Sequence, residues 1–488
     1  MTGNRRDDAL VVAAALLPLG WLLLRERAIA GAAGFPLDDA WIHLHFARNV
    51  AEGAGFVYNP GQPVSGSTAP LWTLLLAAGA LIAGASVAMS KTLGVAAAVG
   101  AALVMRRAAV GFGAPPSIAL VAAIALLWTG PFAWGALSGM EVTLAALLVA
   151  CGLLALARDA TWTTAAAGAL ASLARPEAIL VVPLLAMARP LTWRRALVFA
   201  AVTTALLAPF LAFSYATVGR PLPATAVAKV EGGLLGWLAG IREPPSVTWL
   251  VRPRDFGLEW IRWLFAANPL LPLALPAVAV AWRRCGRTLG IVGLALVAHP
   301  LGMALLAPYR GPAFQEGRYS THLLPVAAVL LAAALARGLR PRPVTLAVPL
   351  AAGLLALAPA AERYAWGVQN INGMQVHLGR WLDTHTPREA TLAVNDIGAI
   401  AFFSRRPVVD LMGLVTPEIV PYRRAGEPGV MRYVAERCPD YVVIFPAWFP
   451  RLAAREDLLT RVYAVRLDRN EVSGADEMVV YRLARCAV

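Results

Sequence analysis

The first 360 residues alternate between long apolar segments and short polar connections. A membrane-spanning helix needs about 20 apolar residues, and fewer where protein shields its ends. On this pattern we predict apolar helices near residues 9–24, 70–84, 88–105, 116–134, 141–157, 161–174, 177–188, 196–214, 268–282, 288–306, 322–336 and 344–360. The chain is therefore predicted to be a polytopic α-helical membrane protein.

Arginine clusters in alternate connections orient these segments. The clusters lie near residues 158, 189–195, 283–287 and 337–342. The positive-inside bias assigns them to the cytoplasm together with the N-terminus, so the loops 25–69, 215–267 and 307–321 and the tail from residue 361 are external. An external tail requires an odd number of crossings. We therefore expect a broken or re-entrant segment between residues 70 and 134, and about 11 transmembrane helices.

The tail has a different pattern. Residues 369–385 have helical periodicity, and strand-like runs follow at 391–394, 408–411, 441–445, 462–467 and 478–483. We predict two domains, a transmembrane domain over residues 1–360 and a soluble extracytoplasmic α/β domain over residues 361–488. Cys438 and Cys486 of the tail are either a disulfide pair, if the tail is extracytoplasmic, or two buried free thiols.

Two external loops contain amphipathic stretches. Residues 39–52 place apolar side chains at helical spacing, and Arg48 and Glu52 are four residues apart on the more polar side. Residues 233–265 contain Trp237, Trp249, Trp260 and Trp263. Both stretches are predicted to lie at the outer membrane surface, where tryptophan is favoured.

Composition narrows the functional class. Hydrophobic residues make up 59% of the chain, charged residues 15%, and the mean hydropathy is +0.63. Of the net charge of +14, nearly all lies before residue 360, in the apolar part. Such an excess suits anionic lipid headgroups or lipid phosphates, whereas nucleic-acid binding would need a basic patch on a soluble face. We therefore expect membrane lipids as partners and no nucleic acid.

Asp38 and Asp39 open the helix predicted at 39–52. An aspartate in this position is commonly a helix cap. A carboxylate at a membrane surface is costly, however, and a helix N-terminus keeps it ionised, as a general base must be. Both interpretations stay open, and His43, one turn beyond Asp39, either orients it or is a solvated surface residue.

Further charged residues lie at external ends of the predicted segments. Glu141 opens one segment, and Arg175 and Glu177 interrupt another, either as an internal ion pair or as a substrate contact. Four cationic or titratable residues in the external loops are candidates to neutralise a phosphate: Lys229, Arg310, Arg318 and His322.

Six strings occur in a fixed order between about Leu37 and Glu418: LDDAWIHLHFARNVAEGAGFVYNPGQPVSGSTAPLWTLLL, SGMEVTLAALL, ARPEAILVVPLL, VGRPLPATAVAK, GRYSTHLLP and NDIGAIAFFSRRPVVDLMGLVTPEI. Together they resemble the GT-C class of membrane glycosyltransferases, most closely the arabinofuranosyltransferases of actinobacterial cell walls. The resemblance implies an enzyme of the bacterial cytoplasmic (inner) membrane that acts on the extracytoplasmic, periplasmic face.

The same resemblance implies an inverting transfer of a sugar, such as the pentose arabinofuranose, from a polyprenyl-phosphate donor to a hydroxyl of a glycan, lipid or protein acceptor. The family's general base falls on the Asp38–Asp39 pair, with Asp38 the first choice, and its second external acid falls on Glu141. No cofactor is implied with certainty. Carboxylates are hard oxygen ligands, so a divalent cation bridging the acids and the phosphate is compatible with the sequence, although no string is a metal signature.

Three other classes remain as alternatives. A lipid-linked glycan polymerase or ligase would use a polyprenyl diphosphate. A flippase or secondary carrier would show internal repeats and charges near the bilayer midplane, whereas the charges here gather at one end of the segments. An assembly protein without catalytic activity is the third.

Overall fold

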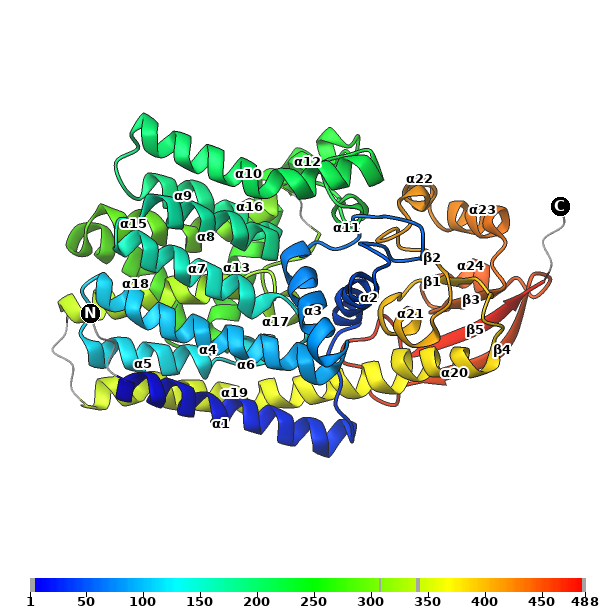
Figure 1. The fold of residues 1–488 in the computed structure, drawn as a ribbon, viewed down its shortest axis with the longest axis horizontal. Helices are drawn as coiled ribbons and strands as arrows, with labels where there is room; N and C mark the ends of the chain where they lie inside the picture. Colours follow the sequence, from blue (N-terminus) through cyan, green and yellow to red (C-terminus); the bar gives the residue numbers. More distant parts are fainter. Residues whose placement is uncertain (1–4, 307–308, 339–342, 485–488) are drawn as a thin grey trace. The chain divides into compact units, whose positions relative to one another are not determined.

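The computed structural model describes residues 5–306, 309–338 and 343–484. The chain forms two compact units. The helical unit comprises Met1–Leu23, Lys91–Pro209 and Lys229–Glu362, and the mixed unit comprises Leu24–Ser90, Phe210–Ala228 and Arg363–Val488. Four helices have residues in both units: α1 (Arg5–Ala30), α4 (Val87–Gly111), α10 (Trp193–Val218) and α19 (Pro343–Ile371). Figure 1 shows the ribbon with most of the helices and strands labelled.

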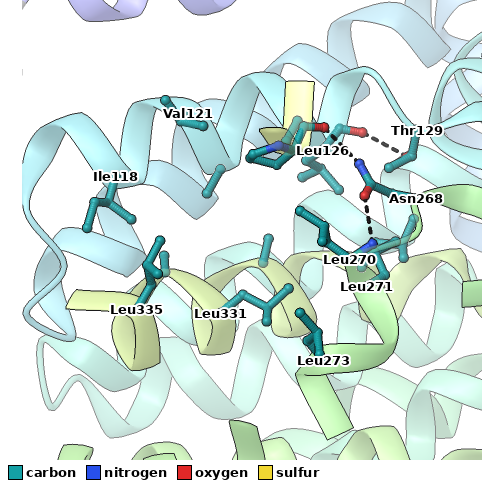
Figure 2. Close-up of a pocket in the computed structure, with 16 residues that line it drawn as sticks. Ile118, Val121, Leu126, Thr129, Asn268, Leu270, Leu271, Leu273, Leu331 and Leu335 are labelled. Carbon is teal, nitrogen blue, oxygen red and sulfur yellow. Dashed lines mark hydrogen bonds between the residues drawn. The ribbon is translucent and has the colours of Figure 1, made fainter. Parts of the chain in front are cut away.

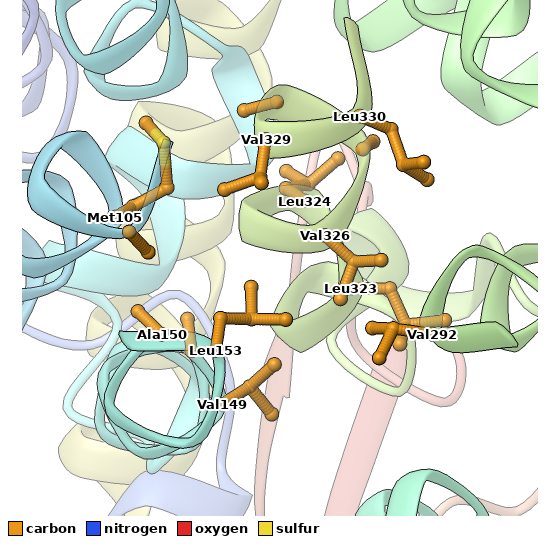
Figure 3. Close-up of a cluster of buried hydrophobic side chains, with 14 of the residues drawn as sticks. Met105, Val149, Ala150, Leu153, Val292, Leu323, Leu324, Val326, Val329 and Leu330 are labelled. Carbon is orange, nitrogen blue, oxygen red and sulfur yellow. The ribbon is translucent and has the colours of Figure 1, made fainter. Parts of the chain in front are cut away.

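The helical unit otherwise contains α5 (Pro116–Leu127), α6 (Gly130–Leu137), α7 (Val142–Ala157), α8 (Thr161–Ala174), α9 (Val181–Met187), α12 (Gly233–Leu238), α13 (Arg252–Ala267), α14 (Ala274–Val280), α15 (Arg287–Gly293), α16 (Ala295–Leu306), α17 (Phe314–Gly317) and α18 (Leu324–Gly338). Its interior is built from alanine, valine and leucine of many helices (Figure 3). Small residues let helix backbones approach closely. At Gly94 a Cβ would lie 2.3 Å from the carbonyl oxygen of Ala136, so only glycine permits this contact between α4 and α6.

Each of the twelve predicted apolar segments falls on helix. Five helices within the described residues are long and apolar enough to cross a membrane, and a sixth span is counted if α5 and α6 are one segment bent by 61°. That bent pair is the broken segment expected between residues 70 and 134. Other segments are divided into short pieces, such as Pro176–Leu180 followed by α9. The chain is a multi-pass membrane protein, and the count of about 11 crossings stays a prediction.

The mixed unit contains the predicted α/β fold. Its strands are β1 (Leu392–Val394), β2 (Val408–Asp410), β3 (Tyr441–Ile444), β4 (Leu459–Arg466) and β5 (Glu477–Leu483), in the order β2-β1-β3-β5-β4. β1 is parallel to β2 and β3, with Leu392 paired to Val408 and to Tyr441, whereas β5 is antiparallel to β3 and β4. All five predicted strands and the helix at 369–385 are confirmed.

Helices cover both faces of this sheet (Figure 1). They are α2 (Asp39–Ala51), α20 (His377–His385), α21 (Gly398–Ser404), α22 (Val420–Arg424), α23 (Glu427–Arg437) and α24 (Pro450–Ala453). The unit also contains α3 (Pro70–Ala83) and α11 (Ala224–Ala228). Alternating residues of β1 point to opposite faces, so Leu392 and Val394 join one apolar cluster with α2, α20 and α21, and Ala393 joins another with α23 and α24. The central strands β1 and β3 are buried on both sides, which explains their continuous apolar runs, whereas most of the edge strand β4 is exposed or half-buried.

The prediction that both amphipathic loops lie at a membrane surface is wrong for the first loop and for part of the second. Helix α2 forms as predicted but does not lie on a membrane surface, because Ala40 through Asn49 are buried in the mixed unit. Arg48 donates to the carbonyl oxygen of Phe402 at 2.7 Å, and within the described residues it forms no ion pair with Glu52. In the second loop Trp260 and Trp263 are buried in the core of the helical unit, while Trp237 and Trp249 are exposed.

Cys438 is disulfide-bonded. Cys486, its predicted partner, lies outside the described residues. Cys151 and Cys285 are free thiols.

Candidate functional site

Asp38 lies at the beginning of α2, but its side chain makes no capping hydrogen bond to that helix. Its carboxylate instead accepts hydrogen bonds from the backbone N–H groups of Gly398 (2.6 Å) and Ala399 (2.7 Å), at the start of α21. A Cβ at position 398 would lie 2.1 Å from the carbonyl oxygen of Asp38, so glycine is required for this approach. The carboxylate thus holds together two segments that are 360 residues apart in the chain.

Burial and neighbouring charge control the protonation of Asp38. Burial raises the pKa of its carboxyl from 3.8 to about 6, the two backbone N–H bonds oppose this rise, and the charge of Asp39 adds to it. The carboxyl of Asp396 lies close enough to Asp38 for the two groups to affect one another's pKa. Burial and the charge of Asp38 raise the pKa of Asp396 well above 3.8. Of these two carboxyls, Asp396 therefore holds its proton more tightly than Asp38 does.

The sequence analysis did not identify Asp396 or its neighbour Gln375. The Nε2 of Gln375 donates to Asp396 Oδ2 at 2.7 Å. A signal was present, since Asn395 and Asp396 directly follow a predicted strand, and polar residues at the carboxyl ends of parallel strands frequently face a ligand.

Asp39 and His43 differ in their surroundings. The side chain of Asp39 is half-buried, and so is more accessible than that of Asp38. His43 is buried, and its Nδ1 lies 3.2 Å from the hydroxyls of both Ser67 and Thr73. The interpretation of His43 as a solvated surface residue is therefore wrong. A contact between His43 and Asp39 stays a prediction.

The helical unit has its own polar cluster. Arg175 is buried and pairs with Glu141, which is fully buried, and with Glu177 at 2.9 Å. The ion-pair interpretation of Arg175 and Glu177 is therefore confirmed, and Glu141 belongs to the same network. The guanidinium of Arg175 also lies 4.3 Å from the ring centre of Tyr319, within cation–π distance.

Arg318 joins this cluster through the same tyrosine. Its Nη2 lies 3.3 Å from the Tyr319 hydroxyl, and its guanidinium carbon is 5.1 Å from the ring centre. Lys229 and Arg310 lie over the ring of Tyr309, at 5.4 and 5.2 Å. The predicted cations thus meet two tyrosines of one segment, Tyr309 and Tyr319, which the sequence analysis missed although both stand beside a candidate arginine.

His322 and His299 are buried beside one another, with ring centres 5.3 Å apart. His299 Nε2 lies 2.9 Å from the Ser320 hydroxyl. Neither ring nitrogen of His322 has a hydrogen-bond partner among the described residues. A buried imidazole of this kind suits a contact with a ligand.

A metal ion fits this arrangement poorly. No group of three or more His, Cys, Asp and Glu side chains that could hold a metal ion is present in the described parts of the chain. Both carboxylate oxygens of Asp38 already accept backbone hydrogen bonds. We therefore derive no step through a metal ion.

An apolar pocket of about 200 Å³ lies elsewhere in the helical unit (Figure 2). It is lined by residues such as Ile118 and Leu331, and its polar end is Asn268, which donates to the carbonyl oxygen of Pro349. None of the predicted site residues lines this pocket. Its lining suits a hydrocarbon chain rather than acid–base chemistry.

Comparisons with known proteins found matches to the C-terminal α/β region and to the fold of nearly the whole chain. The profile of a family described as "Domain of unknown function (DUF8728)" matches residues 369–481, which contain the sheet. No curated protein sequence matches the chain.

Solved structures share the fold at low sequence identity. AglB, the archaeal oligosaccharyltransferase from Archaeoglobus fulgidus in complex with an inhibitory peptide and a dolichol-phosphate, matches with a TM-score of 0.58 and 13% identity over 98% of this chain and 76% of that one. ArnT from Cupriavidus metallidurans bound to undecaprenyl phosphate matches with a TM-score of 0.58 and 14% identity over 97% of both chains. The Archaeoglobus fulgidus oligosaccharyltransferase in complex with Zn and sulfate matches with a TM-score of 0.57 and 15% identity, over 97% of this chain and 73% of that one.

These matches confirm the predicted fold class, a GT-C-type α-helical membrane protein with a C-terminal α/β domain. The extracytoplasmic location of that domain, the boundary at residue 360 and the closeness to arabinofuranosyltransferases stay predictions.

Proposed function

We propose that this protein is a membrane glycosyltransferase that moves a sugar from a polyprenyl-phosphate donor to an acceptor hydroxyl, with inversion at the anomeric carbon. The fold shared with AglB and ArnT supports this proposal, because the first is an oligosaccharyltransferase with dolichol-phosphate bound and the second has undecaprenyl phosphate bound. The observation that carries it is the cluster of cations around Tyr309 and Tyr319 in the helical unit, which suits a lipid phosphate; the mixed unit holds its own buried carboxyl at Asp38. We place the reaction on the periplasmic face of the bacterial inner membrane, with arabinofuranose as the first donor sugar to test.

Asp39 is the proposed general base. A base must reach the acceptor hydroxyl and be ionised. Asp38 meets neither condition well, because it is buried, both of its carboxylate oxygens accept backbone hydrogen bonds, and burial raises its pKa to about 6. This reverses the preference for Asp38 drawn from the sequence. Asp38 then acts as a positioning residue that holds the beginning of α2 against α21.

Arg318 and Lys229 are proposed to bind the donor phosphate, supported by Arg310 and His322. Glu141, Arg175 and Glu177 form the ion-paired base of this cluster, and Arg175 keeps the Tyr319 ring in place. Phosphate is already a fair leaving group, so the cations mainly neutralise its charge.

The reaction balances with these groups alone. The acceptor oxygen forms a bond to the anomeric carbon while the bond from that carbon to the phosphate oxygen breaks. The hydroxyl proton goes to the Asp39 carboxylate, and the polyprenyl phosphate leaves as an anion. Attack from the face opposite the leaving group inverts the anomeric carbon.

A transfer assay with a polyprenyl-phosphate sugar, run beside a donor-binding measurement, tests the proposal. Asp39→Asn should lower transfer by about 10²–10⁴-fold, the usual contribution of a general base, and leave donor binding intact. Arg318→Ala should weaken donor binding as well as transfer, because a cation that meets the phosphate also acts in the ground state. Asp468→Asn, an exposed aspartate of the mixed unit, is the matched control.

Near-normal transfer by Asp39→Asn would show that another residue is the general base. Transfer only from a polyprenyl-diphosphate-linked glycan would favour the polymerase or ligase class, and translocation of the intact lipid-linked sugar without transfer would favour a flippase.

A further inference from the structure

The mixed unit has a topological switch point at the carboxyl end of β1. The chain leaves β1 through α21 to reach β2 on one side, while β3 lies on the other side, and all three strands are parallel (Figure 1). In open α/β sheets, ligands bind outside the carboxyl ends of the strands at such a point. Asn395 and Asp396 follow β1 here, and Phe445 and Trp448 follow β3.

Two amide side chains at this edge are buried with one polar atom unsatisfied. Gln375, which is 0% exposed, donates through Nε2 to Asp396 and, at 3.3 Å, to the Ser473 hydroxyl, but its Oε1 has no partner among the described residues. Asn395, 4% exposed, accepts from the Phe445 N–H, but its Nδ2 has no partner in the same part of the chain. Burying an unsatisfied polar atom is costly, so one unsatisfied acceptor and one unsatisfied donor at this edge of the sheet indicate a polar ligand.

An exposed aromatic ring completes the set. The indole N–H of Trp448 donates to the carbonyl oxygen of Gly474, and the side chain is 45% exposed. A Cβ at position 474 would lie 2.5 Å from the Trp448 ring and 2.8 Å from Phe445, so the loop that carries Ser473 lies directly against these rings.

This chemistry matches a sugar. Planar amides and a carboxylate pair well with neighbouring hydroxyls, which both donate and accept, while an indole ring covers the apolar C–H face of a sugar ring. A few placed polar groups beside an aromatic ring are typical of small-molecule sites. Asp396, half-buried, belongs to this set and also contacts Asp38, the neighbour of the proposed base.

We propose that Gln375, Asn395 and Asp396, with Trp448, bind a sugar unit of the acceptor, so that the acceptor is a glycan rather than a peptide or a lipid without sugar. That the bound sugar belongs to an acceptor rests on the proposed function. The sugar site itself does not depend on it. It assigns a role to residues 369–481, the region that matches the family profile.

Saturation-transfer NMR on the purified full chain in detergent micelles tests the site. The probes are methyl arabinofuranoside and methyl mannopyranoside, with glycerol as a control for hydroxyls that are not on a ring. We expect at least one glycoside to bind and glycerol not to bind.

Two variants locate the binding. Asn395→Asp keeps an oxygen that accepts from Phe445 and replaces the unsatisfied donor by a carboxylate oxygen. Gln375→Ala removes the unsatisfied acceptor together with the hydrogen bonds that Gln375 donates to Asp396 and Ser473. Each should weaken glycoside affinity by about tenfold, as expected for one lost hydrogen bond. Gln62→Ala, an exposed glutamine of the same unit, should change nothing. A melting curve for each variant shows whether it is folded.

The inference is overturned if neither glycoside binds the wild-type chain, or if both folded variants bind as the wild type does. Its failure is distinct from that of the proposed function. Glycoside binding that needs Asn395, in a chain that transfers no sugar from any polyprenyl-phosphate donor, would keep the sugar site and reject the enzyme. Normal transfer without glycoside binding would do the reverse.

Discussion

Replacing Asp38 by Asn should change how the stability of the protein depends on pH. In the wild type, burial raises the pKa of Asp38 from 3.8 to about 6. The folded state therefore binds the proton more tightly than the unfolded chain does. Its stability from this residue is highest below pH 3.8 and is lost progressively as the pH rises towards 6. Asn titrates nowhere in this range.

The magnitude follows from the same values. A rise in pKa from 3.8 to about 6 corresponds to on the order of 3 kcal/mol, at 1.36 kcal/mol for each unit of pH. At pH 4 the variant should be the less stable protein by about 1 kcal/mol, because an amide can accept from only one of the two α21 N–H groups without turning its own NH₂ towards the other. By pH 7 it should have gained on the order of 3 kcal/mol relative to the wild type.

Replacing Asp38 also removes a charge that raises the pKa of Asp396, so the pKa of Asp396 should fall towards its ordinary value. This change also makes the variant gain stability relative to the wild type as the pH rises. Asp410, a third buried carboxyl with a pKa raised to about 6, is present in both proteins and cancels in the difference.

The assay is thermal unfolding in detergent micelles at a series of pH values between 4 and 7. The melting temperature of Asp38→Asn minus that of the wild type should rise with pH by several degrees. Asp468→Asn should follow the wild type at every pH. Parallel curves for Asp38→Asn and the wild type, or a difference that falls with pH, would refute the assignment of Asp38 as a buried carboxyl that holds a proton.

Three further predictions concern packing and orientation. Arg175→Met should destabilise the folded protein by about 3–5 kcal/mol, seen as a lower melting temperature, because it leaves the buried carboxylate of Glu141 without its cation; an unchanged melting temperature would contradict the buried ion pair. Gly398→Ala should lower stability by about 1–3 kcal/mol through overpacking, whereas Gly257→Ala, at a helical position where a Cβ meets nothing within 4 Å, should be neutral or stabilising. A cysteine at Thr384 should react with an impermeant reagent in intact cells if the α/β domain is external, and labelling only after permeabilisation would reverse the orientation.

The local pattern of apolar and polar residues was sufficient to predict the helices and strands of this protein. A membrane helix satisfies its backbone hydrogen bonds within itself, and a strand covered on both faces is apolar throughout. Each element is therefore recognisable from the composition of a short stretch of sequence, about 3 to 25 residues long. The apolar segments and the five strands of the tail are therefore readable from the sequence. The ion pair of Arg175 and Glu177 was readable for the same reason, since the two residues are close neighbours in the chain.

Contacts between distant segments were not readable. An amphipathic pattern shows that one side of α2 is covered, but lipid and protein favour the same apolar residues, so only the fold shows that α2 is buried in the mixed unit. Asp38 looked like a cap of its own helix, because capping is a local rule, yet its carboxylate bonds to Gly398 and Ala399, 360 residues further on. The influence of Asp38 on the pKa of Asp396 depends on that approach. Which aspartate is held and which is accessible was thus decided by tertiary structure, because burial and neighbouring charge exist only once the distant segments have met.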